Sequence, residues 1–344
     1  MVVVRPVNLD DLDRLSELAS SARFGLTSLP KDRDLLRKRI IESQFSFQKI
    51  TEQPGGELYV FVLEDLDTAT VVGTSCIVSK VGGFEPFYAY RIENTVHQSH
   101  TLHIRKEIQA LNLVAEHSGP SEIGGLFLVP EYRKHGTGRL LSLFRFLFMA
   151  EHPARFEPVV IAEMRGVVDD EGYSPFWEAI GRHFFEMDYS KADLLSVMDK
   201  RFIADLMPRS PIYLPLLPKE ARDVIGMVHE EAKPALKMLQ DEGFIISDMV
   251  DIFEAGPIIH CRLDEIRIVQ ESRHVVVQEI TSDPVKSIPF VMINAGRGFR
   301  AGVGNVEQGP KGGVRIRAET AEALHLDVGG KIRFGPLHVR RENR

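Results

Sequence analysis

The sequence predicts an α/β protein in which helices flank a mixed sheet and a small β-rich region follows. Three features support this class. Two amphipathic helical segments open the chain, β-rich segments then lead into alternating strands and helices, and short β-rich pieces separated by Gly and Pro follow residue 273. We therefore expect a main domain at residues 1–272 and a small β-rich C-terminal domain at residues 273–344.

The two opening helices are predicted from their caps and apolar spacing. The first is expected to begin after Asn8, whose side chain can accept hydrogen bonds from free backbone amides. Leu15 and Leu18 then give it a buried face. A second amphipathic helix is expected at residues 32–47, and residues 25–30 form the break between the two.

The later elements follow from the same two periodicities. Strands are expected at residues 58–63, 71–81, 123–129, 158–164, 224–228 and 244–253. Helices are expected at residues 136–150, 174–185 and 231–242. The C-terminal β-rich pieces are residues 275–280, 288–293, 314–318 and 326–334. Residues 82–119 show no clear pattern.

Composition and charge exclude several classes of protein. The 344 residues are 44 % hydrophobic and 26 % charged, which is typical of a compact globular chain. The formal charge of −7 argues against binding nucleic acid through its phosphates. Cys76 and Cys261 are too few for a disulfide framework and fit a reducing cytoplasm. The most apolar run, residues 140–150, is too short to span a membrane, so we expect a cytoplasmic protein.

Residues 126–141 carry the clearest chemical signal. A buried strand ends at Pro130, a basic turn with Gly136 and Gly138 follows, and an apolar-faced helix begins at once. Glycines allow close approach to the backbone, and the first amides of a helix lack helical partners, so such a turn suits a pyrophosphate. A helix cap without a ligand is the alternative for the Gly-x-Gly turn taken alone. Neighbouring positive charge comes from Arg133, Lys134 and Arg139.

In its full context this stretch resembles the acyl-coenzyme A signature of the GCN5-related N-acetyltransferase superfamily. Strand, Pro, Glu-Tyr-Arg, x-x-Gly-x-Gly and Leu-Leu follow in that order. A dinucleotide-binding turn would instead follow the first strand of a βαβ unit, with an acidic residue about 20 positions later. The resemblance implies an acyl-CoA N-acyltransferase-like fold. It also implies a coenzyme site formed by Leu126, Leu128, Arg133, Gly136, Thr137, Gly138 and Arg139.

A wider set of segments resembles the arginine N-succinyltransferase family. These segments run from residue 1 to about residue 270 and include residues 25–30, 59–65, 162–166, 174–177 and 251–257. The resemblance implies transfer of a succinyl group from succinyl-CoA to the α-amine of L-arginine, in the catabolism of arginine. Succinyl-CoA is then a co-substrate, and no permanently bound cofactor is expected. Ornithine or another amine as acceptor, or a non-catalytic acyl-CoA-binding subunit, remain the alternatives.

The family resemblance also implies roles for single residues. In that family a histidine after Gly-x-Val is the proton donor, and Gly226-Met-Val-His229 matches it. A leucine of the Leu-Phe-Leu strand is associated with succinyl-CoA and corresponds to Leu126. The preceding Gly124-Gly125 replaces a residue that is often polar, which leaves the strand geometry there open. A core or capping histidine at a strand–helix junction is the alternative for His229.

Amine attack on a thioester needs particular groups. It creates an oxyanion and expels a thiolate, so the site requires donors toward the carbonyl, an acceptor for the amine proton and an acid for sulfur. A histidine can supply the acid, and backbone amides around Leu126 and Leu128 can supply the donors. Transfer can be direct, and Cys76 lies in an apolar, strand-like run that is typical of a core cysteine.

Substrate recognition is expected to rest on charge. A guanidinium is best held by carboxylates, for which Glu163, Asp251 and Glu254 are candidates, and Arg165 is a candidate for the succinyl carboxylate. Structural ion pairing is the alternative for each. The loop with Thr27 and Ser28 lines the acceptor pocket or simply links two helices.

The spacing of three histidines invites a metal interpretation, which we do not adopt. His97, His100 and His103 are three residues apart, but their neighbours are typical of extended chain, and the family needs no metal. As partners we expect L-arginine and succinyl-CoA, but neither nucleic acid nor a membrane. We also expect a homo-oligomer or a heteromer with a paralogous subunit.

Overall fold

The computed structural model describes residues 1–21, 29–198, 200–296, 298–309 and 312–339. Its main sheet is mixed, and nearly all neighbouring strands in it are antiparallel. Its strands, in spatial order, are β1 (Val2–Pro6), β2 (Leu58–Asp65), β3 (Thr70–Val78), β6 (Ser121–Leu128), β7 (Val159–Glu163), β10 (Pro257–Arg262), β9 (Ile245–Val250), β4 (Phe87–Ser99), β5 (Ile104–Glu116) and β8 (Ile212–Tyr213).

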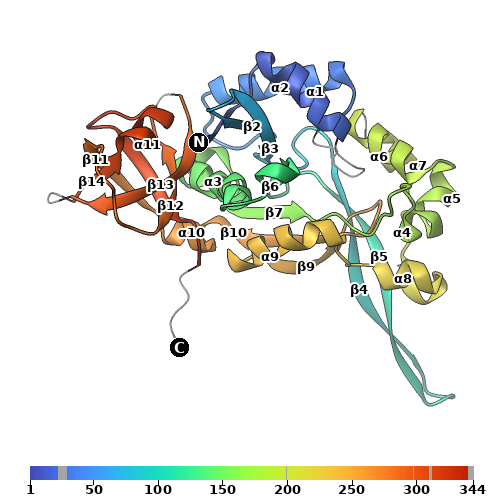
Figure 1. Cartoon of the computed structure of the whole chain (residues 1–344). Coiled ribbons are helices and arrows are strands. Elements are labelled where there is room, and N and C mark those ends of the chain that lie inside the picture. The colour runs from blue at the N-terminus through green and yellow to red at the C-terminus, as the bar shows by residue number, and fades with distance from the viewer. Residues whose placement is uncertain (22–28, 199, 297, 310–311, 340–344) are drawn as a thin grey trace.

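Helices cover both faces of this sheet. Because side chains alternate along a strand, Tyr59 and Phe61 of β2 pack toward α3 (Thr137–Glu151), whereas Val62 packs toward α1 (Leu12–Ser21) and α2 (Arg33–Gln48). Figure 1 shows α1 and α2 together on one side of the sheet. The capping prediction is confirmed: Asn8 caps the turn η1 (Leu9–Asp11) that leads into α1.

The right-hand end of Figure 1 is a helical cluster beside a long hairpin. The β4–β5 hairpin projects from the body of the molecule. The helices in this region are α4 (Pro175–Ala179), α5 (Gly181–Phe185), α6 (Tyr189–Met198), α7 (Arg201–Leu206) and α8 (Lys219–Val224). The remaining short helices and turns before the barrel are η2 (Pro130–Tyr132), η3 (Pro153–Arg155), η4 (Leu214–Leu216), η5 (Glu230–Ala232), α9 (Lys233–Asp241), η6 (Leu263–Glu265) and α10 (Arg267–Gln270).

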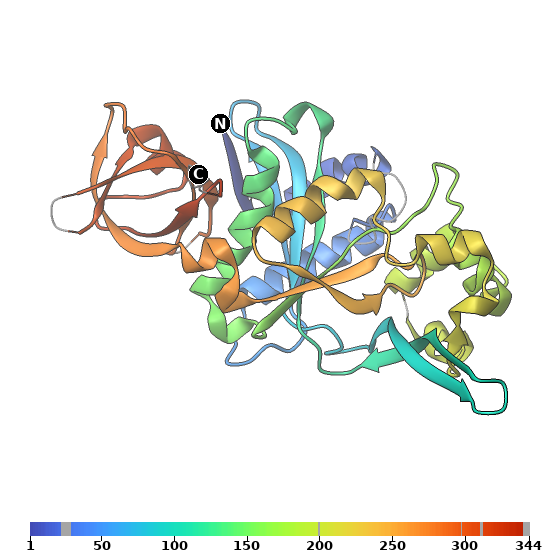
Figure 2. The same cartoon turned by 90° about the horizontal axis from the view of Figure 1, so that it is seen from below.

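The C-terminal strands close into a small barrel at the other end of the molecule (Figures 1 and 2). Pairing runs through β12, β15, β11, β14 and β13 and returns from β13 to β12. Val4 of β1 also pairs with Ala301 of β13, which joins the barrel to the main sheet. The domain boundary after residue 272 therefore stays a proposal. The barrel elements are β11 (Arg273–Thr281), β12 (Pro289–Asn294), β13 (Ala301–Gln308), β14 (Val314–Arg317), α11 (Ala318–Ala323) and β15 (Lys331–Pro336).

The predicted fold class is confirmed, whereas some elements differ from expectation. The strand expected at residues 224–228 is wrong: α8 ends at Val224, and Gly226, with φ of +73°, turns the chain into a loop. The helix expected at residues 174–185 is two helices, because Ile180 leaves helical geometry. The sequence analysis missed the strands β1, β4, β5, β8, β10 and β13 and the helices α6, α7, α8, α10 and α11.

Candidate active site

A cleft of about 1940 Å³ opens where two central strands diverge. Strands β6 and β7 are parallel, but they pair only at Ser121–Val160 and Glu122–Ile161. Beyond Glu122 the strands separate, and the β7 side of β6 has no strand partner in the described chain. The wall of the cleft is formed by β6, the turn before α3, the end of β7, α2, α9 and the segment 251–254.

A bulge shapes β6 at this point. Gly125 has φ of +61°, which favours glycine, and the register with β3 shifts between Thr74 and Cys76. The Thr74 hydroxyl donates to the Gly125 carbonyl at 3.0 Å and fixes the bulge. The sequence left open how the strand runs at Gly124-Gly125. The structure shows that these glycines form a bulge, which changes the direction of β6 beside Leu126.

The turn between β6 and α3 presents free backbone amides. His135 and Gly136 both have positive φ, at +53° and +81°. The amide of Thr137 donates to the Lys134 carbonyl, and Leu140 donates to Gly136. In the described chain no acceptor is found for the amides of His135, Gly136, Gly138 and Arg139. Four donors at the positive end of a 15-residue helix form a site suited to an anion.

The two glycines of the turn serve different purposes. A side chain on Gly136 would come within 2.9 Å of Leu337 and would require a strained φ. Gly138 has nothing within 4 Å of its missing Cβ, so the space above it is open. Gly136 therefore allows the turn to pack on the C-terminal barrel, and Gly138 keeps room for a ligand.

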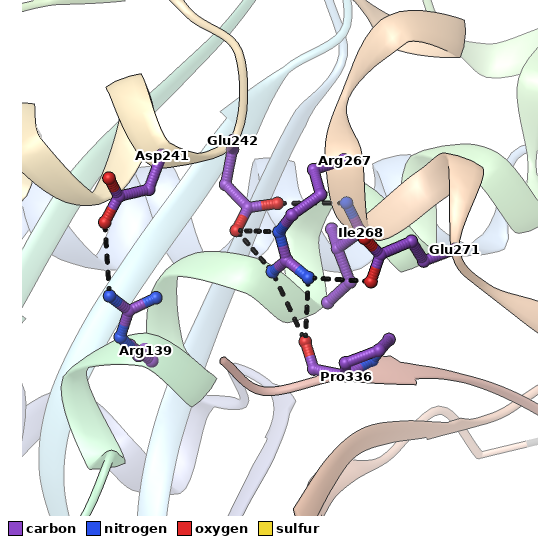
Figure 3. Close-up of polar contacts among 7 residues, drawn as sticks. All are labelled: Arg139, Asp241, Glu242, Arg267, Ile268, Glu271 and Pro336. Carbon is purple, nitrogen blue, oxygen red and sulfur yellow. Dashed lines mark hydrogen bonds and ion pairs between the residues drawn. The ribbon is translucent and has the colours of Figure 1, made fainter. Parts of the chain in front are cut away.

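Two of the three cations at the turn, Arg133 and Arg139, already have hydrogen-bond acceptors. Arg133 donates through Nε to the Leu128 carbonyl at 2.9 Å. Arg139 donates to Asp241 at 3.4 Å, and nearby Arg267 donates to buried Glu242 and to the carbonyl of Pro336 (Figure 3). Of the predicted coenzyme residues, the cleft is lined by Leu126, Leu128, Arg133, Gly136 and Gly138. Thr137 and Arg139 lie beside it within the same turn.

His229 begins the turn η5 at the margin of the cleft. Its backbone amide donates to the Arg165 carbonyl at 2.9 Å, and its Nδ1 accepts from the Glu231 amide at 3.2 Å. The neutral ring therefore carries its proton on Nε2, and the carbonyl of Val168 lies near the ring. Burial and then Arg165 lower the pKa of His229. Arg165 and Glu231 line the cleft, whereas His229 itself caps a turn beside it.

The predicted carboxylates come together on one wall of the cleft. Together with two carboxylates that were not predicted, they form what we call the acidic cluster: Glu122, Glu163, Asp193, Asp251 and Glu254. These groups interact electrostatically, and enclosure in the cleft, followed by neighbouring carboxylates, raises the pKa of Glu163 well above its usual range. The same causes raise the pKa of Glu254 to about 8, and burial raises that of Asp193 to about 7. The raised pKa values show that the positive charges near the cluster are too few to keep all five carboxyl groups ionised.

Hydrogen bonds fix two members of the cluster. Glu254 accepts from the Gly166 amide at 3.1 Å and from the Tyr189 hydroxyl. Asp251 accepts from the amides of Phe253 and Glu254 at 2.6 and 2.8 Å. Within the part of the chain that the structure describes, Glu163 at the end of β7 has no such hydrogen bond, and its side chain is exposed. It is therefore the member most accessible to a ligand.

Arg165 lies near the cluster and reaches Glu231 at 3.6 Å. Thr27 and Ser28 lie outside the described residues. Sequence reasoning missed Glu122, Asp193, Tyr189 and Lys200, which also borders the cluster. The one usable signal was the spacing of Tyr189 and Asp193, four residues apart on one face of α6.

Other expectations concern metals and membranes. Within the described ranges, no group of three or more His, Cys, Asp or Glu side chains is arranged to hold a metal ion. His97 lies on β4, and His100 and His103 lie in the turn that follows. Across the same described ranges, no helix has both the length and the apolar character needed to cross a bilayer.

Comparison with known proteins decides the family. Residues 2–268 match the arginine N-succinyltransferase beta subunit family, and residues 273–336 match the C-terminal domain of that subunit. The chain belongs to the arginine N-succinyltransferase family. It is therefore an acyltransferase, as the sequence predicted.

Individual relatives support this assignment. Arginine N-succinyltransferases from Escherichia coli strains UMN026 and K12 (DH10B) are 46 % identical over 281 residues, which is 81 % of each chain. The solved structure of arginine/ornithine succinyltransferase subunit AI from Pseudomonas aeruginosa has a TM-score of 0.90 and 36 % identity. It covers 98 % of this chain and 99 % of its own. The family's fold thus extends through both the main sheet and the barrel.

Proposed function

We propose that this family member transfers the succinyl group of succinyl-CoA to the α-amine of L-arginine and so forms N2-succinyl-L-arginine and free coenzyme A. The observation that carries the proposal is the cleft, which joins unpaired amides suited to a diphosphate to an acidic cluster suited to a cation. One substrate is strongly anionic and the other cationic, so the two ends of the cleft match them. Succinyl-CoA enters as a substrate, with no resident cofactor.

The donor end is proposed to bind the diphosphate of coenzyme A. The free amides from His135 to Arg139 provide directed donors, and the open space above Gly138 gives them access. The unpaired side of β6 can then hydrogen-bond to the amide groups of the pantetheine arm, as a further strand would. A pantetheine arm that runs along β6 from the turn brings the thioester toward the bulge at Gly125.

The acceptor end is proposed to bind arginine through Glu163 and Glu254, with Asp251 shaping the loop. A guanidinium keeps its charge at any physiological pH and forms paired hydrogen bonds with a carboxylate. Binding it among carboxylates whose pKa is raised lowers that pKa again, because the added positive charge favours ionisation. Arginine binding is therefore coupled to the release of protons.

The chemical step needs no covalent enzyme intermediate. The neutral α-amine attacks the thioester carbonyl, forming the C–N bond, and β6 amides near Leu126 and Leu128 stabilise the oxyanion. The C–S bond then breaks, the nitrogen loses one proton, and the thiolate of coenzyme A gains one. We assign the second transfer to His229, as the family resemblance implies.

The contacts of His229 define the decisive variant pair. In the observed arrangement Nδ1 accepts from the Glu231 amide and the Val168 carbonyl lies near the ring, so the ring must turn away from that carbonyl to reach sulfur. His229→Asn keeps an acceptor for the Glu231 amide but transfers no proton, whereas His229→Ala removes both functions. If His229 is the acid, both variants lose turnover by about 100-fold or more. If His229→Asn keeps wild-type turnover, the residue is only a cap.

One assay tests the function as a whole. Coenzyme A release is measured with succinyl-CoA and acetyl-CoA, each against arginine, ornithine and lysine. The proposal expects succinyl-CoA with arginine to give the highest kcat/KM. Preference for ornithine would favour the alternative acceptor, since the similar Pseudomonas aeruginosa protein is described as an arginine/ornithine succinyltransferase subunit. Binding of succinyl-CoA without turnover by the isolated chain would instead favour a heteromer with a paralogous subunit.

We place the reaction in the cytoplasm. Both cysteines, Cys76 and Cys261, are free and buried, which suits a reducing compartment. Fractionation of cells that express the chain tests this assignment, since activity outside the cytoplasmic fraction would contradict it.

A further inference from the structure

Arg145, in the middle of α3, is a buried cation without an acidic partner. Its side chain is only 2 % exposed, yet it contributes to the wall of the cleft. Within the described ranges no carboxylate lies within 4 Å of its guanidinium, and the one titratable group that acts on its pKa is the Cys76 thiol. Burial raises the pKa of that thiol to about 11, so it is neutral at pH 7. A buried charge normally requires a partner, so this arrangement calls for an explanation.

The hydrogen bonds of Arg145 leave two donors unused. Nε donates to the Ser142 carbonyl at 3.0 Å, Nη2 to the Ser142 hydroxyl at 3.0 Å and Nη1 to the Gly124 carbonyl at 3.2 Å. A guanidinium has five N–H groups, so one hydrogen remains on each terminal nitrogen. The two bonds to Ser142 are buried, whereas the bond to Gly124 is only partly buried. Nη1 thus lies nearest the edge of the side chain that meets the cleft.

The position of Arg145 along the cleft matches the acyl end of the donor. Arg145 follows Thr137 by eight residues, which is about 12 Å along a helix. Gly124 precedes Leu128 by four residues, which is about 13 Å along a strand. The bond between Arg145 and Gly124 shows that α3 and β6 run side by side over this distance. A donor bound at the turn and extended along β6 therefore brings its acyl group to Arg145.

We propose that Arg145 binds the terminal carboxylate of the succinyl group and so selects a dicarboxylic acyl donor over acetyl-CoA. This inference rests on the proposed function, because it assigns the acyl end of the same cleft. A carboxylate has two oxygens for the two unused hydrogens, and its negative charge offsets the buried guanidinium. The partner that the free protein lacks is then supplied by the substrate.

Two neighbouring cations fit this role less well. Arg165 already lies 3.6 Å from Glu231, and it is near Asp193 of the acidic cluster. Lys200 is coupled to Glu122, Glu163 and Asp251 of that cluster. Both cations thus already interact with carboxylates at the acceptor end of the cleft. Arg145 alone of these three stands apart from the cluster.

The test compares donors in the wild-type chain and in Arg145→Met. Affinities for succinyl-CoA, acetyl-CoA and succinamoyl-CoA, which has an amide in place of the carboxylate, are measured by calorimetry without arginine. We expect the wild-type chain to favour succinyl-CoA over succinamoyl-CoA by roughly 10- to 100-fold, the range of a buried charge-assisted hydrogen bond. In Arg145→Met this preference should disappear while acetyl-CoA binds as before. Arg182→Met, on the exposed end of another helix, is the matched control and should keep the preference.

Two further measurements keep the inference separate from the proposed function. Calorimetry needs no turnover, so failure of arginine as acceptor would refute the function without affecting the donor preference. If Arg145→Met does not fold, a crystal structure of the wild-type chain with succinyl-CoA decides the matter. A succinyl carboxylate within 3.5 Å of the Arg145 terminal nitrogens supports the inference. A carboxylate on Arg165 or Lys200, or a preference that survives in Arg145→Met, overturns it.

Discussion

The two ends of the cleft are built in different ways. The donor end consists of backbone amides from one continuous segment between Leu128 and Leu140. The acceptor end consists of side chains from four separate segments, which are β6, β7, α6 and the loop 251–254. A backbone site depends on φ angles and free space, whereas a side-chain site depends on charge. The two ends should therefore respond to different kinds of substitution.

The donor end should show the largest effect of a single substitution. Gly138→Asp places a carboxylate in the open space above the turn, where it repels a diphosphate and occupies its amides. We expect the KM for succinyl-CoA to rise about 100-fold, equivalent to ~3 kcal/mol of lost binding. This KM is measured by steady-state kinetics with succinyl-CoA as the varied substrate and arginine at saturation.

A matched variant controls for the effect of volume. Gly138→Ala adds only a methyl group where nothing lies within 4 Å, and it should change the KM by less than about threefold. Gly136 is unsuitable for this test, because a side chain there meets Leu337 and strains the backbone. An unchanged KM in Gly138→Asp would remove the diphosphate from this turn.

The same contrast explains what the sequence could predict. The donor turn was predicted because its glycines, cations and helix start are neighbours in the chain. The bulge at Gly125 and the packing of Leu337 on Gly136 depend on distant strands, so no local pattern revealed them. For the acceptor end, Glu163, Asp251 and Glu254 were chosen by charge, but Glu122 and Asp193 were missed because only the folded sheet brings them near.

His229 shows the limit of local reasoning. The sequence predicted a strand before it, since residues 224–228 are rich in Val and Ile. Beyond Val224 these residues instead form a loop that turns at Gly226. Val228 is buried in the core from this loop, without pairing in a β-sheet. Tertiary burial thus replaced strand pairing as the role of those side chains.

A charge removed from the acceptor end should have a medium effect. Glu163→Gln keeps the shape of the side chain, and it removes the member of the cluster that is most open to a ligand. We expect kcat/KM for arginine to fall roughly 10- to 30-fold, as for loss of one charge-assisted pair, while the KM for succinyl-CoA stays constant. Glu319→Gln, on the barrel and paired with Arg317, is the control and should change neither constant. Equal losses toward both substrates would show that the variant had damaged the fold.

The smallest and sharpest effect concerns pH. Asp193 and Glu254 have raised pKa values of about 7 and about 8, so both ionise as the pH rises through this range while the guanidinium of arginine stays charged. The affinity for arginine, measured by calorimetry without succinyl-CoA, should therefore increase roughly tenfold between about pH 6 and pH 9. An affinity that falls over this range would mean that arginine binds elsewhere.

Tyr189→Phe tests which carboxylate sets that profile. The Tyr189 hydroxyl donates to Glu254 and stabilises its ionised form, which partly offsets the effect of burial on the pKa. Removing the hydroxyl raises the pKa of Glu254 further, and the ring, which is 1 % exposed, keeps its packing. We expect the midpoint of the affinity profile to move to higher pH, with only a few-fold loss of affinity at about pH 9. An unmoved midpoint would assign the profile to Asp193, which receives no hydrogen bond from Tyr189, and would leave Glu254 as a structural acid held by the Gly166 amide.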